Sequence, residues 1–265
     1  MSTFVTALCL ILIGIAMIHP VFFMPIDRQI QQGNAQRKLL QSNYLVHIVT
    51  GAISILLYWI YGINYPLQLA GTVYLTVIIV VVLFYWRSEL TKWNLFTASI
   101  VFGFIIYFRS VNEIVEITPL WPGIFTGLVG SGTLSILLIL IIEAGSKNVA
   151  TTYSVFIKRL INLLFVFVGI RIAWDVVILF NLSVATRYGE TISALRYFWQ
   201  ADSTKLMLLL LSGVFLPVLY LLFLRRKLIT SSAKVKFVLV SLLFISVITA
   251  EFLSKYFLLQ FGIVL

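Results

Sequence analysis

The stretch FVLVSLLFISVITAEFLSKYF, from Phe237 to Phe257, decides the class of fold. Its apolar residues surround the whole helix instead of one face, and its length matches the roughly 20 residues that a helix needs to cross a membrane. The same stretch carries two opposite charges, Glu251 and Lys255, which lie one helical turn apart on one face. It therefore predicts a membrane-spanning helix with charged groups inside the span.

The composition of the whole chain has the same character. Of its 265 residues, 61% are hydrophobic and 11% are charged, whereas soluble domains have about 25% charged residues. A single cysteine, Cys9, and two histidines are too few for a cysteine-ligated iron–sulfur cluster, a structural zinc site or several haems. In so apolar a chain, the net charge of +10 is more typical of loop charges that set membrane topology than of nucleic-acid binding.

Eight stretches are long and apolar enough to span a membrane. The predicted helices are Thr3–Met24, Asn43–Ile63, Leu67–Trp86, Trp93–Phe108, Pro122–Glu143, Leu160–Leu182, Leu206–Leu224 and Phe237–Phe257. The first run lacks a positively charged n-region and a small-residue cleavage motif, which favours a spanning helix over a removed signal peptide. The longest loop, about 183–205, has room only for a short interfacial helix. We therefore expect an all-α integral membrane protein, a single transmembrane domain over residues 1–265 built as two packed four-helix bundles.

Basic residues gather in alternate loops of this topology. Thirteen of them fall in the first, third, fifth and seventh loops: Arg28, Arg37, Lys38, Arg87, Lys92, Lys147, Lys158, Arg159, Arg225, Arg226, Lys227, Lys234 and Lys236. The other loops hold Arg109, Arg187, Arg196 and Lys205. Because cytoplasmic loops are enriched in Lys and Arg, the odd loops are expected in the cytoplasm and both termini on the outer, periplasmic side.

Three opposite-charge pairs recur at an i, i+4 spacing in or beside the predicted spans. They are Arg109 and Glu113, Arg171 and Asp175, and Glu251 and Lys255. A charge at the centre of a spanning helix costs about 2.5–3.5 kcal/mol on insertion scales. With a rise of about 1.5 Å per residue, all three pairs are expected in the outer half of the membrane. Lys255, nearest the interface, is expected to snorkel toward water.

Two interpretations of these pairs stay open. They can be structural ion pairs that lock helix packing, or they can line a shared polar pocket for a quinone headgroup, for protons or for a transported ion. In the pocket interpretation Tyr61 is a further hydrogen-bond donor. The glycines of the fifth span, which begin with Gly123 and Gly127, predict close helix packing.

The two histidines form a separate candidate site. His19 and His47 lie near the cytoplasmic ends of the first and second predicted helices, which places them at similar depth. Two histidines at one depth can ligate one b-type haem. The alternative is a pair of buried histidines held by hydrogen bonds.

Three stretches resemble the membrane-anchor subunits of dimethyl sulfoxide reductase. The first, Phe102–Leu134 (FGFIIYFRSVNEIVEITPLWPGIFTGLVGSGTL), has a basic residue at a helix end, a Pro/Trp pair and a glycine-rich helix. The second, Ser203–Leu222, has a leucine run and a proline. The third, Ala250–Phe257, is similar to the family's last helix, with Ser254 and Lys255 in place of a Gly-Arg pair.

The resemblance, which extends to the wider NrfD-like polysulfide reductase anchors, implies a function. Such subunits oxidise menaquinol in the bacterial or archaeal inner membrane and pass electrons to an iron–sulfur subunit, which feeds a molybdopterin catalytic subunit; the anchor holds no metal. The chain departs from the family near the outer end of the second helix, where YWIYGINYPLQ has tyrosines in place of a functional histidine. A secondary transporter is the remaining alternative, with the ion pairs as coupling sites.

Overall fold

The protein is a bundle of long apolar helices. The computed structural model describes residues 3–29, 34–62, 65–86, 93–114, 121–145, 154–185, 191–227 and 233–261. Within these ranges, eight helical segments are long and apolar enough to cross a membrane. This confirms the predicted class, an all-α multi-pass membrane protein, and the predicted number of spans.

The helices are longer than the predicted spans. The first four are α1 (Thr3–Gln29), α2 (Asn34–Tyr61), α3 (Tyr65–Tyr85) and α4 (Trp93–Ile114). The later ones are α5 (Trp121–Gly145), α6 (Ser154–Asn181), α7 (Ala194–Leu210), the π-helix η2 (Leu211–Phe215), α8 (Leu216–Lys227) and α9 (Ala233–Phe261). Hydropathy locates the part of a helix that lies in hydrocarbon, whereas helical hydrogen bonding continues into polar residues beyond it. The start of α2, nine residues before the predicted Asn43, shows this difference.

The seventh span departs most from prediction. It was expected over 206–224, but α7, η2 and α8 together form one span over Ala194–Arg226. The predicted loop over 183–205 begins with an antiparallel pair of short strands, β1 (Ser183–Ala185) and β2 (Thr191–Ser193). The short helix for which this loop had room is the first part of α7, from Ala194 to a kink at Asp202. Ser193 ends the hairpin and caps α7, because its hydroxyl accepts a hydrogen bond from the backbone N–H of Arg196 at 3.4 Å.

The seventh span is also interrupted. Asp202 has non-helical backbone angles (φ −158°, ψ 73°) inside α7. Its carboxylate accepts the backbone N–H of Lys205 at 3.2 Å and the Lys205 ammonium at 2.6 Å, so it acts as a cap for the part of α7 that follows. The π-helix η2 begins nine residues, about two and a half turns, after this kink. Single π-helical turns often mark functional positions.

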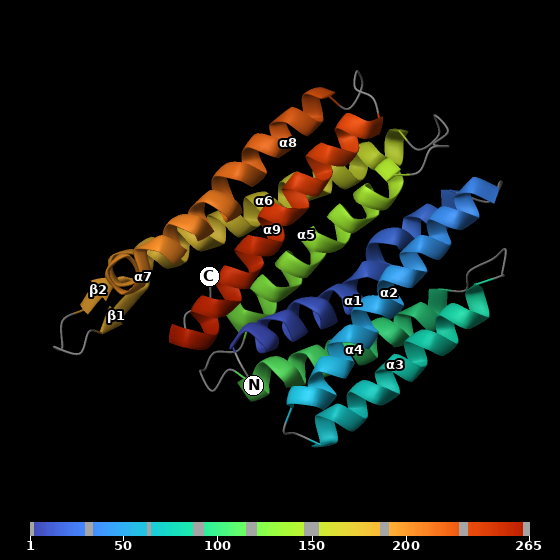
Figure 1. Cartoon of the computed structure of the whole chain (residues 1–265), viewed down its shortest axis with the longest axis horizontal. Helices are drawn as coiled ribbons and strands as arrows, with labels where there is room; N and C mark the ends of the chain where they lie inside the picture. Colours follow the sequence, from blue (N-terminus) through green and yellow to red (C-terminus); the bar gives the residue numbers. More distant parts are fainter. Residues whose placement is uncertain are drawn as a thin grey trace.

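The helices pack around α1 and α5, which lie side by side at the centre (Figure 1). Helix α1 contacts α2, α4, α5 and α9, while α5 contacts α6 and α9. Helix α1 begins and α9 ends at the same end of the bundle (Figure 1), where the rings of Phe4 and Phe252 stack with centroids 5.2 Å apart. The interface between α5, α6 and α9 is where the candidate site lies.

Candidate functional site

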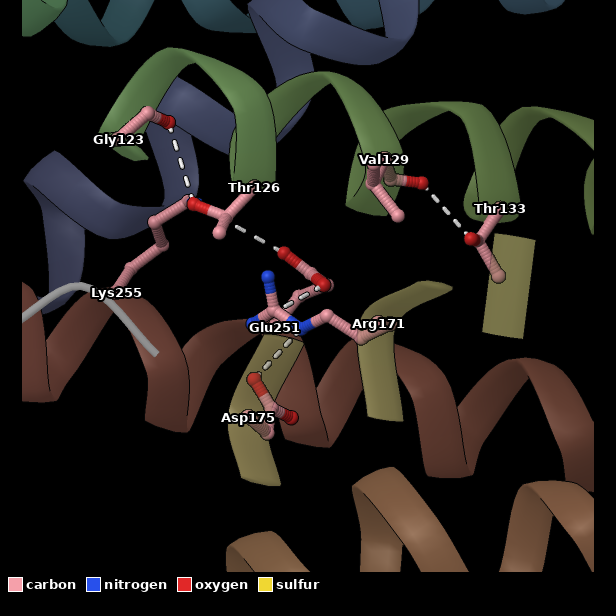
Figure 2. Close-up of polar contacts among 8 residues, drawn as sticks. All are labelled: Gly123, Thr126, Val129, Thr133, Arg171, Asp175, Glu251 and Lys255. Atoms are coloured by element: carbon pink, nitrogen blue, oxygen red, sulfur yellow. Dashed lines mark hydrogen bonds and ion pairs between the residues drawn. The ribbon is translucent and has the colours of Figure 1, made fainter. Parts of the chain in front are cut away.

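Four charged side chains from α6 and α9 meet against α5 (Figure 2). Arg171 and Asp175 project from α6, with Nε and Oδ1 3.4 Å apart. Glu251 and Lys255 project from α9, with Oε2 and Nζ 3.9 Å apart. The two pairs are joined across the helices by Arg171 Nη2 and Glu251 Oε1 at 3.6 Å. We refer to these four residues as the charge cluster.

The charge cluster is buried and electrically balanced. Its side chains are between 3% and 9% exposed, and its two cations and two anions sum to zero when all are ionised. Each carboxylate has a basic group beside it, and Glu251 lies between Arg171 and Lys255. Because a buried ion is tolerated only with an opposite charge or hydrogen bonds nearby, the four groups depend on one another.

Helix α5 has glycines, which carry no side chain, at the positions closest to the charge cluster. A Cβ atom at Gly130 would collide with the carboxylate of Glu251, and one at Gly127 would collide with the hydroxyl of Tyr107. The fully buried Tyr107 phenol, from α4, also interacts electrostatically with Glu251 and Arg171. The close packing predicted for the α5 glycines is therefore confirmed. At Gly130 the closely packed neighbour is the carboxylate of Glu251.

The hydroxyl groups of the nearby threonines donate hydrogen bonds to backbone carbonyls of α5 itself. Thr126 donates to the carbonyl of Gly123 at 3.3 Å, and Thr133 donates to the carbonyl of Val129 at 2.8 Å (Figure 2). Among the described residues, neither Asp175 Oδ1 nor Lys255 Nζ has a hydrogen-bond partner. The ion pairs are also longer than the 2.7–2.9 Å of a strong charge-assisted hydrogen bond. The cluster thus keeps hydrogen-bonding capacity for another polar group.

A small cavity lies beside the cluster. Its volume is about 20 Å³ and its walls include Arg171 and Glu251 together with Gly213 of η2 and Pro217 of α8. This volume holds about one water molecule. The interrupted seventh span therefore reaches the charge cluster, and the cavity lies between this span and helices α5, α6 and α9.

The other predicted site residues lie elsewhere. Tyr61, on α2, is 48% exposed, and Arg109, on α4, is also exposed. Glu113 belongs to α4, but its side chain lies outside the described residues. Lys255 was expected to snorkel and does not, since it is 2% exposed. Its i, i+4 spacing from Glu251 keeps it on the face of α9 that is buried, so the ammonium stays with the carboxylate instead of reaching water.

The two histidines are both buried completely, on the neighbouring helices α1 and α2. The rings of His19 and His47 are close enough to interact electrostatically. His47 Nε2 lies 3.2 Å from the hydroxyl of Ser99, and His19 packs against the ring of Phe23. The expectation that they lie at similar depth agrees with this proximity.

Comparison of the chain with protein-family models, with curated proteins and with solved structures finds no match in any of the three. The similarity to dimethyl sulfoxide reductase anchors therefore stays a prediction from the three stretches quoted above.

Proposed function

We propose that this chain is the membrane-anchor and quinol-oxidising subunit of a multisubunit molybdopterin/iron–sulfur oxidoreductase. Menaquinol would be oxidised within the bundle, and its electrons would pass to an iron–sulfur partner subunit and from there to a molybdopterin catalytic subunit. In this proposal the chain lies in a bacterial or archaeal inner membrane as two four-helix halves, with both termini and the partner subunits on the periplasmic side. The observation that carries the proposal is the charge cluster buried inside a membrane bundle.

The cluster has the groups that quinol oxidation needs. Oxidation of a quinol to a quinone releases two electrons and two protons, so the site needs proton acceptors and groups that hold the two ring oxygens. Glu251 and Asp175 are the acceptors, each able to take one proton on a carboxylate oxygen. Arg171 and Lys255 orient the ring oxygens by donating hydrogen bonds, and they compensate the negative charge of the carboxylates until protons arrive.

The size of the cavity adds a requirement. A volume of about 20 Å³ admits a water molecule but not an aromatic ring, so the quinol ring enters only if the wall moves. The movable wall is η2, because a π-helical turn and the adjacent Pro217 weaken the regular hydrogen bonding of the span. A groove of about 600 Å³ on the outer surface of α7 and η2, lined mainly by apolar residues such as Trp199, Met207 and Phe215, would receive the apolar tail.

Purification in mild detergent tests the assembly. The proposal expects two further polypeptides to copurify, one containing iron and the other molybdenum. Recovery of the chain alone, without metal-containing partners, would count against an anchor role. Within an active complex, Glu251→Gln and Asp175→Asn are expected to lower quinol-dependent turnover at least tenfold, whereas unchanged turnover and inhibitor binding in both variants would remove the cluster from the site.

A b-type haem on His19 and His47 is a second candidate, favoured by their burial on adjacent helices. A reduced-minus-oxidised spectrum of the purified protein decides it: a b-type band that disappears in His47→Phe supports the haem. A spectrum without such a band ends this candidate.

A secondary transporter is favoured by one observation, the interruption of the seventh span beside the buried charges. Transporter sites are often built at broken helices near the membrane midplane. This candidate predicts that the chain alone, in vesicles, moves a solute down an imposed ion gradient. The anchor proposal predicts no such movement and requires partner subunits.

A further inference from the structure

A second buried polar cluster occupies the interface of five helices, α1 to α5. We refer to it as the histidine cluster, and its members are His19, Asn43, His47, Tyr74, Ser99 and Ser135, all 0% exposed. His47 and Ser99 are joined by a hydrogen bond of 3.2 Å, and the Tyr74 phenol interacts with the Ser99 side chain. The His19 ring lies near the side chain of Asn43 and the backbone of Ser135, without a hydrogen bond to either. Neither proposed quinol chemistry nor simple packing explains so many buried polar groups in one place.

Several atoms of this cluster keep unused hydrogen-bonding capacity. Within the part of the chain that the structure describes, both ring nitrogens of His19 have no hydrogen-bond partner. The same holds for Asn43 Oδ1, His47 Nδ1 and the hydroxyls of Tyr74 and Ser135, so Tyr74 lies near Ser99 without a hydrogen bond to it. Buried polar groups in proteins are nearly always paired with protein or with ordered water, and a group of such atoms around one space is the setting in which buried water is found.

The histidine cluster is connected to the charge cluster along the contact between α1 and α5. On α1, Gly14 and His19 are five residues apart, a rise of about 7.5 Å; on α5, Ser131 and Ser135 are one turn apart. Ser131 lies directly against Gly14, and the His19 ring lies near the backbone of Ser135, so the two helices keep one register over this distance. Both serines face the α1 side, since i and i+4 share a helix face.

Tyr107 completes the connection at the other end. Its ring lies beside Gly14, about where Ser131 approaches, and its hydroxyl lies against Gly127. The same phenol interacts electrostatically with Glu251 and Arg171. Polar groups therefore recur along the contact between α1 and α5, from Glu251 through Tyr107, Ser131 and Ser135 to the histidines.

We propose that these groups form a hydrated proton-transfer route that joins the charge cluster to the histidine cluster. A proton that leaves the Glu251 carboxyl passes through the hydroxyls of Tyr107, Ser131 and Ser135 and the water between them, each oxygen accepting one proton as it gives up another. His19 and His47 then take a proton on one ring nitrogen and release one from the other. No electrons move, and the net result is one proton carried from one half of the membrane to the other.

The far end of the route lies near the face at which α2 begins. Asn43 is six residues, about 9 Å, from Arg37 at the start of the α2 span, where Arg37 and Lys38 are exposed. The route is independent of the proposed quinol chemistry, because it needs only a proton at Glu251 and not a particular donor. Its failure and the failure of the quinol proposal are thus separate results.

Radiolytic labelling tests the water directly in the unaltered protein, since X-ray pulses generate hydroxyl radicals from bound water in place. After correction for intrinsic reactivity, Tyr74, Tyr107, His19 and His47 are expected to be oxidised at least fivefold faster than Phe257, which is equally buried at 0% exposure but lies in an aromatic cluster. Equal rates would show a dry interface and overturn the proposal.

Proton flux tests the function. In vesicles that contain the purified chain and no quinol, a potassium diffusion potential is expected to drive proton uptake, and Ser131→Ala and His19→Phe are each expected to reduce it at least fivefold. Ser54→Ala is the matched control, because Ser54 is also a buried serine, bonded to the Cys9 carbonyl at 3.2 Å and away from the route, and it should conduct like wild type. Flux no greater than in protein-free vesicles, or full flux in both route variants, would overturn the proposal.

Discussion

The replacement Glu251→Gln is the most direct perturbation of the charge cluster. It removes one of two carboxylates while keeping the shape of the side chain, which leaves Arg171, Lys255 and Asp175 with a net charge of +1. At the 3.9 Å that separates Glu251 from Lys255, the attraction between unit charges is about 4 kcal/mol at an effective dielectric constant near 20. Loss of one partner of a buried pair costs about 3–5 kcal/mol. We therefore expect the free energy of unfolding to fall by about 3–5 kcal/mol.

The assay is reversible unfolding in mixed detergent micelles, followed by circular dichroism. Lys255→Met alone should cost a similar amount, since it leaves a net charge of −1. The double variant Glu251→Gln/Lys255→Met restores neutrality, so it should lose less than either single variant, as a double-mutant cycle measures. A single-variant loss below about 1 kcal/mol, or a double loss equal to the sum of the singles, would refute the idea that the four charges depend on one another.

Three further outcomes can be checked on the purified chain. Gly130→Ala should cost about 1–3 kcal/mol of unfolding free energy, because the new methyl group meets a carboxylate held by two ion pairs. Gly169→Ala should cost nothing, because no atom lies within 4 Å of the added carbon. Equal losses would refute the packing argument. Amine-reactive reagents should modify the exposed Lys38 but not Lys255, as mass spectrometry measures, and labelling of both would place Lys255 at the interface. Asp202→Ala removes the cap of the second part of α7 and should lower the thermal midpoint of unfolding, while Asp202→Asn, which keeps an acceptor for the Lys205 backbone N–H, should lower it less.

The sequence predicted the number of spans because each is an apolar run close to the length that hydrocarbon thickness requires, the fourth being the shortest. It also predicted the pairs within helices, since the i, i+4 spacing alone places Arg171 beside Asp175 and Glu251 beside Lys255. The contact between Arg171 and Glu251 could not be predicted in the same way, because it depends on α6 and α9 being neighbours around α5. The pairing of helices is set by side-chain shapes, among them the missing side chain at Gly130.

The seventh span and the third pair show two other limits. The predicted start of that span was too late because hydropathy assigned polar residues such as Asp202 and Lys205 to a loop. Hydropathy cannot distinguish a loop from a capped, kinked helix. The spacing of Arg109 and Glu113 matched that of the buried pairs, yet Arg109 is exposed. The depth of a residue in the membrane follows from its position along the helix. Whether its side chain faces a neighbouring helix or the outside of the bundle depends on how the helices pack.

The measurement that tests the central claim most directly is the binding of a menaquinol analogue to the purified chain, wild type against Glu251→Gln/Lys255→Met. This double variant keeps the cluster neutral and is expected to stay folded, so a change in binding reports on the site and not on stability. The account predicts a Kd at least tenfold higher in the double variant. An unchanged Kd, or no binding to the wild type, would contradict a quinol site at the charge cluster.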